Sequence, residues 1–434
     1  MKPLATRLIN EAEEAYKSAS EKFENSSIPD HFPNYYKTNI NKQLESAEKS
    51  LKDSKKWYDQ YTYYTSTSKS FQSLISSRFV NYTCDYYDSG NQDFINELLE
   101  QVEEVYNESS KLAKNTEIVD LISLQTVGAA QRRATEAKLY LDSAKSTNLY
   151  TFSDVLDFLY DIAFVVERCN SISWWIGIGD HFNSTGNITD SKLENIALEY
   201  IYEAQQAVTY SEVILNELSQ TSYNSASYLS SAKSLLETAR DDLDSGFPAA
   251  AFFEALEALV KANLALEVIG TNEKDKIDIS SEQAINNIAK SRKQGIEPVL
   301  AVSYYEYAES LSNESSFESA LIYYKYSGMI AGAISYTNAS AGSYKSSYVG
   351  ISRVNAPLSI WVLERLVFII GIFVLGGLAG LGIGLIIGSF LENKQKKKKP
   401  PVHYSSRTYD HTPRYYYPNN QIPRSIKEYY KKNK

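Results

Sequence analysis

Residues Leu366–Leu391 read LVFIIGIFVLGGLAGLGIGLIIGSFL, a run of 26 residues without a charged side chain. A helix of that length is about 39 Å long at about 1.5 Å per residue, and the hydrocarbon core of a bilayer is about 30 Å thick. The alternative is a helix buried in a soluble core. It is disfavoured because such helices rarely stay uncharged beyond about 18 residues. The stretch therefore predicts one membrane-spanning helix.

The charges beside this span predict its orientation. Lys394 and Lys396–Lys399 follow it directly, whereas Arg365 before it is offset by Glu364. Lys and Arg concentrate on the cytoplasmic side of a span, and Trp361 suits the outer interface. We therefore expect a single-pass protein of the cell membrane, with residues 1 to about 355 outside and the tail inside.

The overall charge divides in the same way. The chain carries −9, and the tail 392–434 holds 12 Lys and Arg against 3 Asp and Glu, so the remainder carries −9 − 9 = −18. A basic tail suits the anionic inner leaflet. The acidic remainder argues against nucleic acid, because a phosphate backbone requires a basic face. The expected partners are the lipid bilayer and other proteins or peptides.

Apolar residues before the span recur at helical spacing, and no alternation of period two is sustained, which predicts an all-α fold with short connections. The predicted helices occupy Leu4–Phe23, two patterns within Asn34–Val80, Phe94–Leu112, Ile118–Ala144, Phe152–Val166, Ser191–Leu218, Ser222–Leu243, Pro248–Ile269, Ser280–Lys293, Pro298–Leu311 and Phe317–Ile334.

Between the two helical regions lies Ile172–Gly179, an apolar run that contains Trp174 and Trp175. It reads as a short buried strand or a packed loop, and we favour the loop. The predicted organisation is a first helical hairpin region (1–170), a linker (171–190), a second hairpin region (191–342), a juxtamembrane segment (343–365), the transmembrane helix (366–391) and a basic, Tyr-rich cytoplasmic tail (392–434).

One side-chain pattern recurs on four predicted helices. Small residues at i and i+7 allow a second helix to approach, larger residues at i+3 and i+4 fill the seam, and an aromatic residue begins the return helix. The pattern predicts an array of antiparallel hairpins related as divergent repeats. The alternative is chance likeness among Ala- and Leu-rich helices. The four sets are Ala137/Tyr140/Leu141/Ala144 with Phe152, Ala232/Leu235/Leu236/Ala239 with Phe247, Ala301/Tyr304/Tyr305/Ala308 with Phe317, and a degraded copy, Ala47/Ser50/Leu51/Ser54.

The two cysteines, Cys84 and Cys169, both precede the span. They read either as a disulfide, since an outer compartment is oxidising, or as two free buried thiols. Seven Asn-x-Ser/Thr acceptors for glycosylation also precede it, at Asn25, Asn81, Asn107, Asn183, Asn187, Asn313 and Asn338. Within the span, a stripe of Gly376, Gly380, Gly384 and Gly388 predicts helix association and a homo-oligomer, although glycine is also simply common in spans.

Motifs for chemistry are missing from the sequence. His31, His181, His403 and His411 are not at ligand spacing with a Cys or carboxylate partner, so we predict no metal site and no cofactor. Neither a Gly-x-Ser-x-Gly elbow nor a phosphate-binding glycine loop occurs. Ser340-Ala341-Gly342 with nearby Lys345 superficially matches a Ser–Lys protease motif. Both residues lie in one polar linker, where nothing would desolvate the lysine, so no catalytic residue is predicted.

Several features together carry a resemblance. They are the opening Met1-Lys2-Pro3-Leu4-Ala5, the stretch Pro33-Asn34-Tyr35-Tyr36, the hairpin from Ala47 to Phe71-Gln72-Ser73-Leu74, and the order of Ala- and Tyr-rich hairpins, one span and a lysine-rich stop. In these features the chain resembles the helical C-terminal part of archaeal membrane-anchored Lon-like serine proteases. The resemblance implies an archaeal, protease-associated role at the cell surface. No position matches that family's active-site motif, so no catalytic residue carries over.

Three functions follow as hypotheses. The first is a non-catalytic, extracytoplasmic interaction scaffold, and the second is a portion of a Lon-like Ser–Lys protease whose catalytic domain lies outside this chain. The third is a sensor that signals through the tail tyrosines (Tyr404, Tyr409, Tyr415–Tyr417, Tyr429 and Tyr430). Residues 1–20 lack the apolar stretch of a signal peptide, so we expect either an upstream segment that supplies export or a start at Met1 with the helical part inside the cell.

Overall fold

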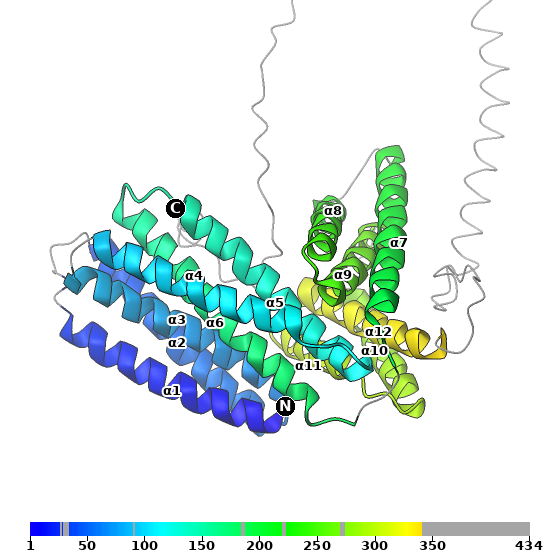
Figure 1. Cartoon of the computed structure of the whole chain (residues 1–434), viewed down its shortest axis with the longest axis horizontal. Helices are drawn as coiled ribbons and strands as arrows, with labels where there is room; N and C mark the ends of the chain where they lie inside the picture. Colours follow the sequence, from blue (N-terminus) through cyan, green and yellow to red (C-terminus); the bar gives the residue numbers. More distant parts are fainter. Residues whose placement is uncertain are drawn as a thin grey trace, which may run out of the picture. The chain divides into compact units, whose positions relative to one another are not determined.

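The helical periodicity of the sequence is realised as packed α-helices in residues 2–340 (Figure 1). The computed structural model describes residues 1–340 apart from 27, 29–33, 90–91, 184–186, 219–222 and 270–273. These residues form twelve helices and no strand, so the all-α prediction is confirmed for them. The helices are α1 (Lys2–Asn25), α2 (Asn34–Asp59), α3 (Tyr63–Ser89), α4 (Gln92–Asn115), α5 (Leu121–Ser146), α6 (Phe152–Gly179), α7 (Asp190–Glu217), α8 (Tyr223–Asp244), α9 (Pro248–Glu267), α10 (Lys274–Lys293), α11 (Val299–Asn313) and α12 (Phe317–Ser340).

The predicted span Leu366–Leu391 and the tail lie outside the described residues. Among the twelve helices described, none combines the length and the apolar character needed to cross a bilayer. All twelve belong to one compact unit of the chain.

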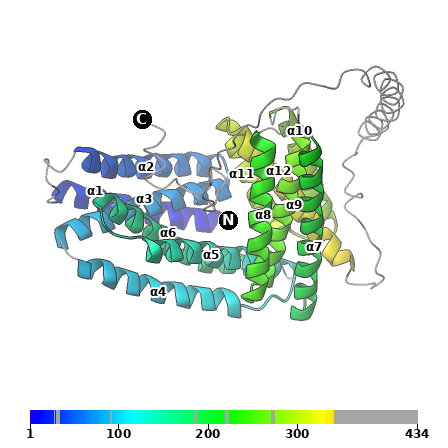
Figure 2. The same cartoon turned by 90° about the horizontal axis from the view of Figure 1, so that it is seen from above.

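Helices α1 to α6 lie side by side in both views (Figure 2). Helix α6 is their core element and contacts α3, α4 and α5, whereas α1 and α2 pack on α3. The α6 side chains of Leu156, Leu159 and Ile162 are fully buried. Burial of these apolar surfaces provides the main stabilisation of the group.

Helix α9 is the core element of the second group, which comprises α7 to α12. It contacts α7, α8 and α12 within the group and α5 from the first group. It is buried on every face, as expected of a core helix, and Ala250, Phe252 and Leu256 have no exposed surface. Helices α10 and α11 pack on α12.

Four connections share one turn geometry. At the end of α8, Gly246 has φ +81°, and the Phe247 N–H donates to the Asp242 carbonyl (2.8 Å). This is the Schellman motif, which satisfies carbonyls left open at a helix end. The other three have left-handed Tyr61, Gly295 and Ser315, with hydrogen bonds from Thr62 to Trp57 (3.1 Å), Ile296 to Ser291 (3.1 Å) and Ser316 to Leu311 (2.8 Å).

The loop predicted for Ile172–Gly179 is wrong. These residues are the last turns of α6, which ends at Gly179, so the connection to α7 begins at Asp180 rather than at 171. Ile172, Trp175 and Ile178 are buried and fall three residues apart on one face. That apolar face continues the packing of α6, so the helix does not stop at Val166.

Candidate functional site

The segment Leu124–Ala134 of α5 is buried at every residue, including its glutamines and arginines. Helix α5 begins with a capping box, in which the Asp120 carboxylate accepts from the Ser123 N–H (2.7 Å) and the Ser123 hydroxyl accepts from the Asp120 N–H (3.0 Å). Beyond its own group it contacts α9 and α11. Buried polar side chains require partners, and Gln125, Gln131 and Arg132 find partners in the second group.

Two glutamines of α5 serve the starts of two distant helices. Gln131 Oε1 accepts hydrogen bonds from the N–H groups of Ala249 (3.1 Å) and Ala250 (3.2 Å) in the first turn of α9. Gln125 Oε1 accepts from the Leu300 N–H (3.0 Å) at the start of α11, and its amide donates to the Glu297 carbonyl (3.1 Å). N–H groups in a first helical turn have no intrahelical acceptor, so α5 caps both helices.

Gly128 lies between these glutamines and faces α9 directly. A Cβ atom added there would lie 2.5 Å from Phe253 Cε2 and 3.2 Å from Ala249 Cβ. The absence of a side chain therefore sets how closely α5 and α9 approach.

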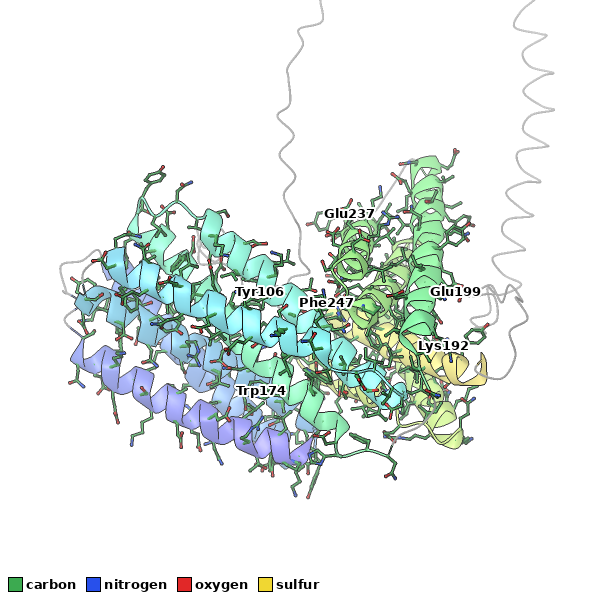
Figure 3. The ribbon with its side chains drawn as sticks, in the orientation of Figure 1. Tyr106, Trp174, Lys192, Glu199, Glu237 and Phe247 are labelled. Carbon is green, nitrogen blue, oxygen red and sulfur yellow. The ribbon has the colours of Figure 1, made fainter. Side chains whose placement is uncertain are left out.

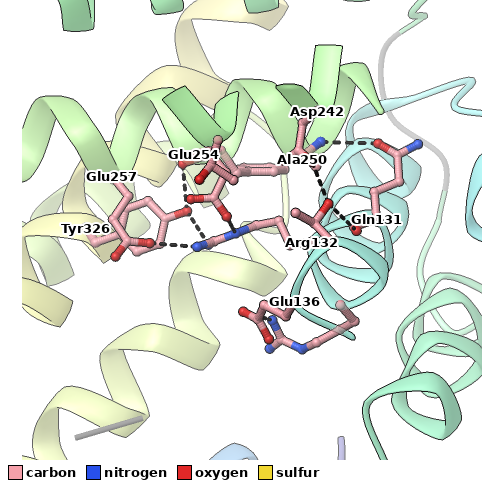
Figure 4. Close-up of polar contacts among 12 residues, drawn as sticks. Gln131, Arg132, Glu136, Asp242, Ala250, Glu254, Glu257 and Tyr326 are labelled. Atoms are coloured by element: carbon pink, nitrogen blue, oxygen red, sulfur yellow. Dashed lines mark hydrogen bonds and ion pairs between the residues drawn. The ribbon is translucent and has the colours of Figure 1, made fainter. Parts of the chain in front are cut away.

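Arg132 is the central charge of the buried site (Figure 4). Its Nε lies 2.6 Å from Glu254 Oε1, and its Nη2 lies 2.7 Å from Glu257 Oε2. Its Nη1 donates to the hydroxyl oxygens of Tyr326 (2.8 Å) and Tyr304 (3.2 Å). One side chain of α5 thus joins α9, α11 and α12.

The two glutamates beside Arg132 differ in their surroundings. Burial raises the pKa of Glu254 above its ordinary value, and Arg132 offsets this in part. Burial also acts on Glu257, but Lys261 and Arg132 together hold its pKa below its usual range. Lys261 Nζ lies 3.1 Å from Glu257 Oε1 and donates to Ser231 Oγ on α8 (3.0 Å).

A second buried cluster lies one turn further along α5. Arg168 Nε lies 2.7 Å from Glu136 Oε2, as an ion pair whose N–H is not directed at that oxygen. Arg133 Nη1 lies 3.6 Å from Glu136 Oε1, and its guanidinium lies 5.8 Å from the Trp175 ring centroid. Burial acts to raise the pKa of Glu136, but Arg168 and Arg133 together lower it by more, so the net shift is downward. The Arg168 guanidinium also lies 4.7 Å from the Phe71 ring centroid.

Asp242, near the end of α8, is a further buried acid beside Glu254 and Arg132. Thr135 Oγ1 donates to its Oδ1 (2.5 Å), while its Oδ2 is buried without a hydrogen bond. Burial and the neighbouring Glu254 raise its pKa well above the usual value. Glu254 Oε2 is likewise buried without a hydrogen bond. A buried carboxyl oxygen that lacks a donor disfavours the ionised form, which fits the raised pKa of Asp242, whereas Glu254 keeps the Arg132 guanidinium as its counter-charge.

The geometry of the site is that of a packing interface. The charges face one another across helices, and no group of three or more His, Cys, Asp and Glu in the described part of the chain could hold a metal ion. A surface hollow near the end of α6 is lined by His181, Phe182, Asn183, Gly295 and Glu297. No nucleophilic Ser, Cys or Lys is among these five. The site holds the two helix groups together through hydrogen bonds and ion pairs.

Cys84 and Cys169 are buried free thiols in the structure. Both lie in the apolar core of the first group. Burial raises the pKa of Cys84 to about 11 and that of Cys169 to about 12.

The described glycosylation acceptors differ in exposure. The exposed ones are Asn25, Asn107, Asn183, Asn187 and Asn313. Asn81 is half-buried in α3 with its Oδ1 shielded from solvent. The glycine stripe Gly376–Gly388, Lys345, the tail tyrosines and the side chains of Asn338 and Ser340 lie outside the described residues.

The buried charge site was missed by reasoning from the sequence. A usable signal was present, because Glu254, Glu257 and Lys261 interrupt an otherwise apolar α9 at spacings of three and four residues. A helix that is apolar on all its other faces is expected to be buried, so its few charged side chains are buried as well. Buried charges are paired. The sequence does not reveal that the two glutamates pair with Arg132, which lies more than a hundred residues earlier.

Comparison with known proteins gives no match: no protein-family model, no curated protein and no solved structure resembles this chain.

Proposed function

We propose that residues 1 to about 355 form an extracytoplasmic interaction scaffold, which the span Leu366–Leu391 anchors in the cell membrane with the basic tail inside. The scaffold is non-catalytic by itself and associates with a protease. The observation that carries the proposal is the buried site around Arg132, whose charged groups are paired with one another. Buried ion pairs are better suited to fixing one arrangement of helices than to reacting with a substrate.

We further propose that divergent hairpins build the scaffold. The α2–α3 and α11–α12 pairs support this with a common hydrogen bond. Ser73 Oγ donates to the Ala47 carbonyl (2.9 Å), and Ser327 Oγ donates to the Ala301 carbonyl (2.7 Å), each across 26 residues. Ala47 and Ala301 open the side-chain pattern found in the sequence. The left-handed turn residue follows each by 14 positions, at Tyr61 and Ser315, and Gly246 follows Ala232 by the same interval.

The topology rests on the sequence, on the lysine cluster after the span and on the acceptors before it. Its test is a protease added to sealed cells, which should degrade the helical part and spare a tag fused at Lys434. Glycan occupancy gives a second readout: exposed Asn187 and Asn313 should be modified in an outer location and half-buried Asn81 should not. Loss of the Lys434 tag with the helical part intact would reverse the orientation.

The second candidate is a portion of a Lon-like Ser–Lys protease whose catalytic domain lies outside this chain. It is favoured only by the resemblance in sequence order. A peptidase assay on the protein purified from native membranes separates the two, because that protein should hydrolyse unstructured peptides only if a catalytic domain is joined to the chain. The N-terminal sequence and intact mass of the protein from native membranes would show whether an upstream segment had been joined to Met1.

A further inference from the structure

Helix α7 presents a second apolar face that no described element covers. Its inward face, with Leu193, Ala197 and Val208, is buried and packs on α8 and α9. The opposite side exposes four large apolar residues, here called the α7 ridge: Leu198 (52% exposed), Tyr202 (59%), Tyr210 (59%) and Val213 (53%).

The ridge has the length and spacing of a helix-binding surface. Leu198, Tyr202 and Val213 are separated by four and eleven residues, which places them close to one line along a helix of 3.6 residues per turn. From Leu198 to Val213 the line is about 22 Å long at about 1.5 Å per residue. Single exposed apolar residues are ordinary on protein surfaces, but an aligned set of this length matches the anchors of a bound amphipathic helix.

Glutamates flank the ridge on both sides. Helix α7 contains six acidic residues and a single lysine, Lys192, for a net charge of −5 (1 − 6). Glu194 lies along one edge, and Glu199, Glu203 and Glu217 lie along the other. Glu199 lies on the side of α7 away from α8 and α9 (Figure 3). In the described part of the chain none of these four glutamates has an ion-pair partner, whereas Glu212 pairs with Lys233 (2.7 Å).

The acidic side chains of this face lie close enough to one another to act on a neighbouring pKa. Burial and the neighbouring Glu199 raise the pKa of Glu203 to about 7. A partner that supplied positive charge along this edge would relieve that repulsion. A second copy of the same face would add like charge, and an anionic membrane surface would be repelled.

We propose that the α7 ridge binds a basic amphipathic helix of a partner protein, with apolar side chains on the ridge and Lys or Arg against the flanking glutamates. The inference rests on the proposed scaffold function and names the chemistry of its partner. The partner helix needs about 15 residues to match the ridge, with apolar anchors at spacings of three and four.

The test uses the full chain in nanodiscs of phosphatidylcholine and a fluorescent 18-residue Leu/Lys peptide with helical amphipathic order. The controls are a Leu/Glu peptide of the same order and a scrambled Leu/Lys peptide. We expect the ordered basic peptide to bind in a salt-sensitive manner, and both controls to bind at least tenfold more weakly. Equal binding of the acidic peptide, or no binding of the basic one, would overturn the proposal.

Variants locate the site. Leu198→Ser/Tyr202→Ser/Val213→Ser should raise the Kd at least tenfold, and Glu199→Gln/Glu217→Gln should weaken binding and flatten its salt dependence. The matched controls are Ile279→Ser/Ile285→Ser, which removes similarly exposed apolar residues (56% and 48%) from α10, and exposed Glu237→Gln on α8. All of these positions are exposed, so helicity by circular dichroism should be unchanged.

A second copy of the chain as the occupant would give a distinct result. If a second copy covers the ridge, the triple variant removes a dimer seen by sedimentation of the wild type, which would overturn the assignment to a basic helix. A chain that hydrolyses peptides would instead overturn the scaffold function. A chain with neither peptidase activity nor peptide binding would overturn the ridge and leave the scaffold standing.

Discussion

The Arg132 guanidinium and the Glu254 carboxylate meet at 2.6 Å across 122 residues of sequence, with both side chains almost fully buried. The pair joins α5 of the first helix group to α9 of the second. Removing one partner of a buried ion pair leaves the other charge without compensation, which is far more costly than losing a pair at the surface.

Arg132→Met should therefore lower the free energy of unfolding by about 3–5 kcal/mol, because Glu254 and Glu257 lose their shared counter-charge. Urea unfolding followed by circular dichroism measures it. The control is Arg7→Met at the exposed Arg7–Glu11 pair, which should cost less than about 1 kcal/mol. Equal losses for the two variants would mean that the buried pair has no special role.

Two glycines in helix interiors should respond oppositely to alanine. Gly128→Ala places a Cβ against Phe253 and should cost about 1–3 kcal/mol through overpacking of α5 on α9. Gly177 in α6 has no atom within 4 Å of such a Cβ, so Gly177→Ala should stabilise the protein by about 0.5–1 kcal/mol through helix propensity. Thermal unfolding of both variants gives the comparison. Tolerance of alanine at 128 would contradict the close approach.

The free energy of unfolding of the helical part should decrease as the pH rises from about 4 to about 7. Burial raises the pKa of Asp161 to about 7 in the folded state, while the unfolded value is about 3.9. In that window the folded state binds a proton that the unfolded state has released, so the free energy of unfolding decreases as pH rises and levels off above about pH 7. Glu203 acts in the same direction.

Asp161→Asn should remove part of this dependence. Its amide oxygen can still accept from Ser143, the partner of Asp161 (2.9 Å), and it cannot ionise. We expect its Tm to exceed that of the wild type by about 2–4 °C at pH 8, the shift for about 1 kcal/mol in a domain of this size, and to match it near pH 4. The exposed Asp142→Asn serves as control. A wild-type Tm that rises from pH 5 to pH 8 would contradict the assignment.

Both cysteines should titrate as thiols after unfolding without reductant. In the native protein their reaction with a thiol reagent should be slow, because burial disfavours both thiolates. Counting reactive thiols in urea decides between the two alternatives that the sequence left open. No thiol released on unfolding would establish the Cys84–Cys169 disulfide instead.

The helices could be predicted from the sequence because their apolar faces repeat at one period. The predicted bounds failed where composition hid that period, as in the Trp174–Trp175 stretch at the end of α6. The buried site could not be predicted, since pairing of Arg132 with Glu254 depends on which helices meet. Considered alone, the arginine in α5 and the glutamate in α9 could each equally lie on the solvent-exposed face of its helix.

Capping of α9 by Gln131 and of α11 by Gln125 has a consequence for how the chain acquires its structure. Synthesis proceeds from the N-terminus, so α5 is complete before either of these helices exists. A fragment that begins at Asp190 would lack the acceptors for the first turns of α9 and α11 and the counter-charge for Glu254. We therefore expect such a fragment to be less stable than the same helices in the whole chain, because the later helices need groups that the earlier ones supply.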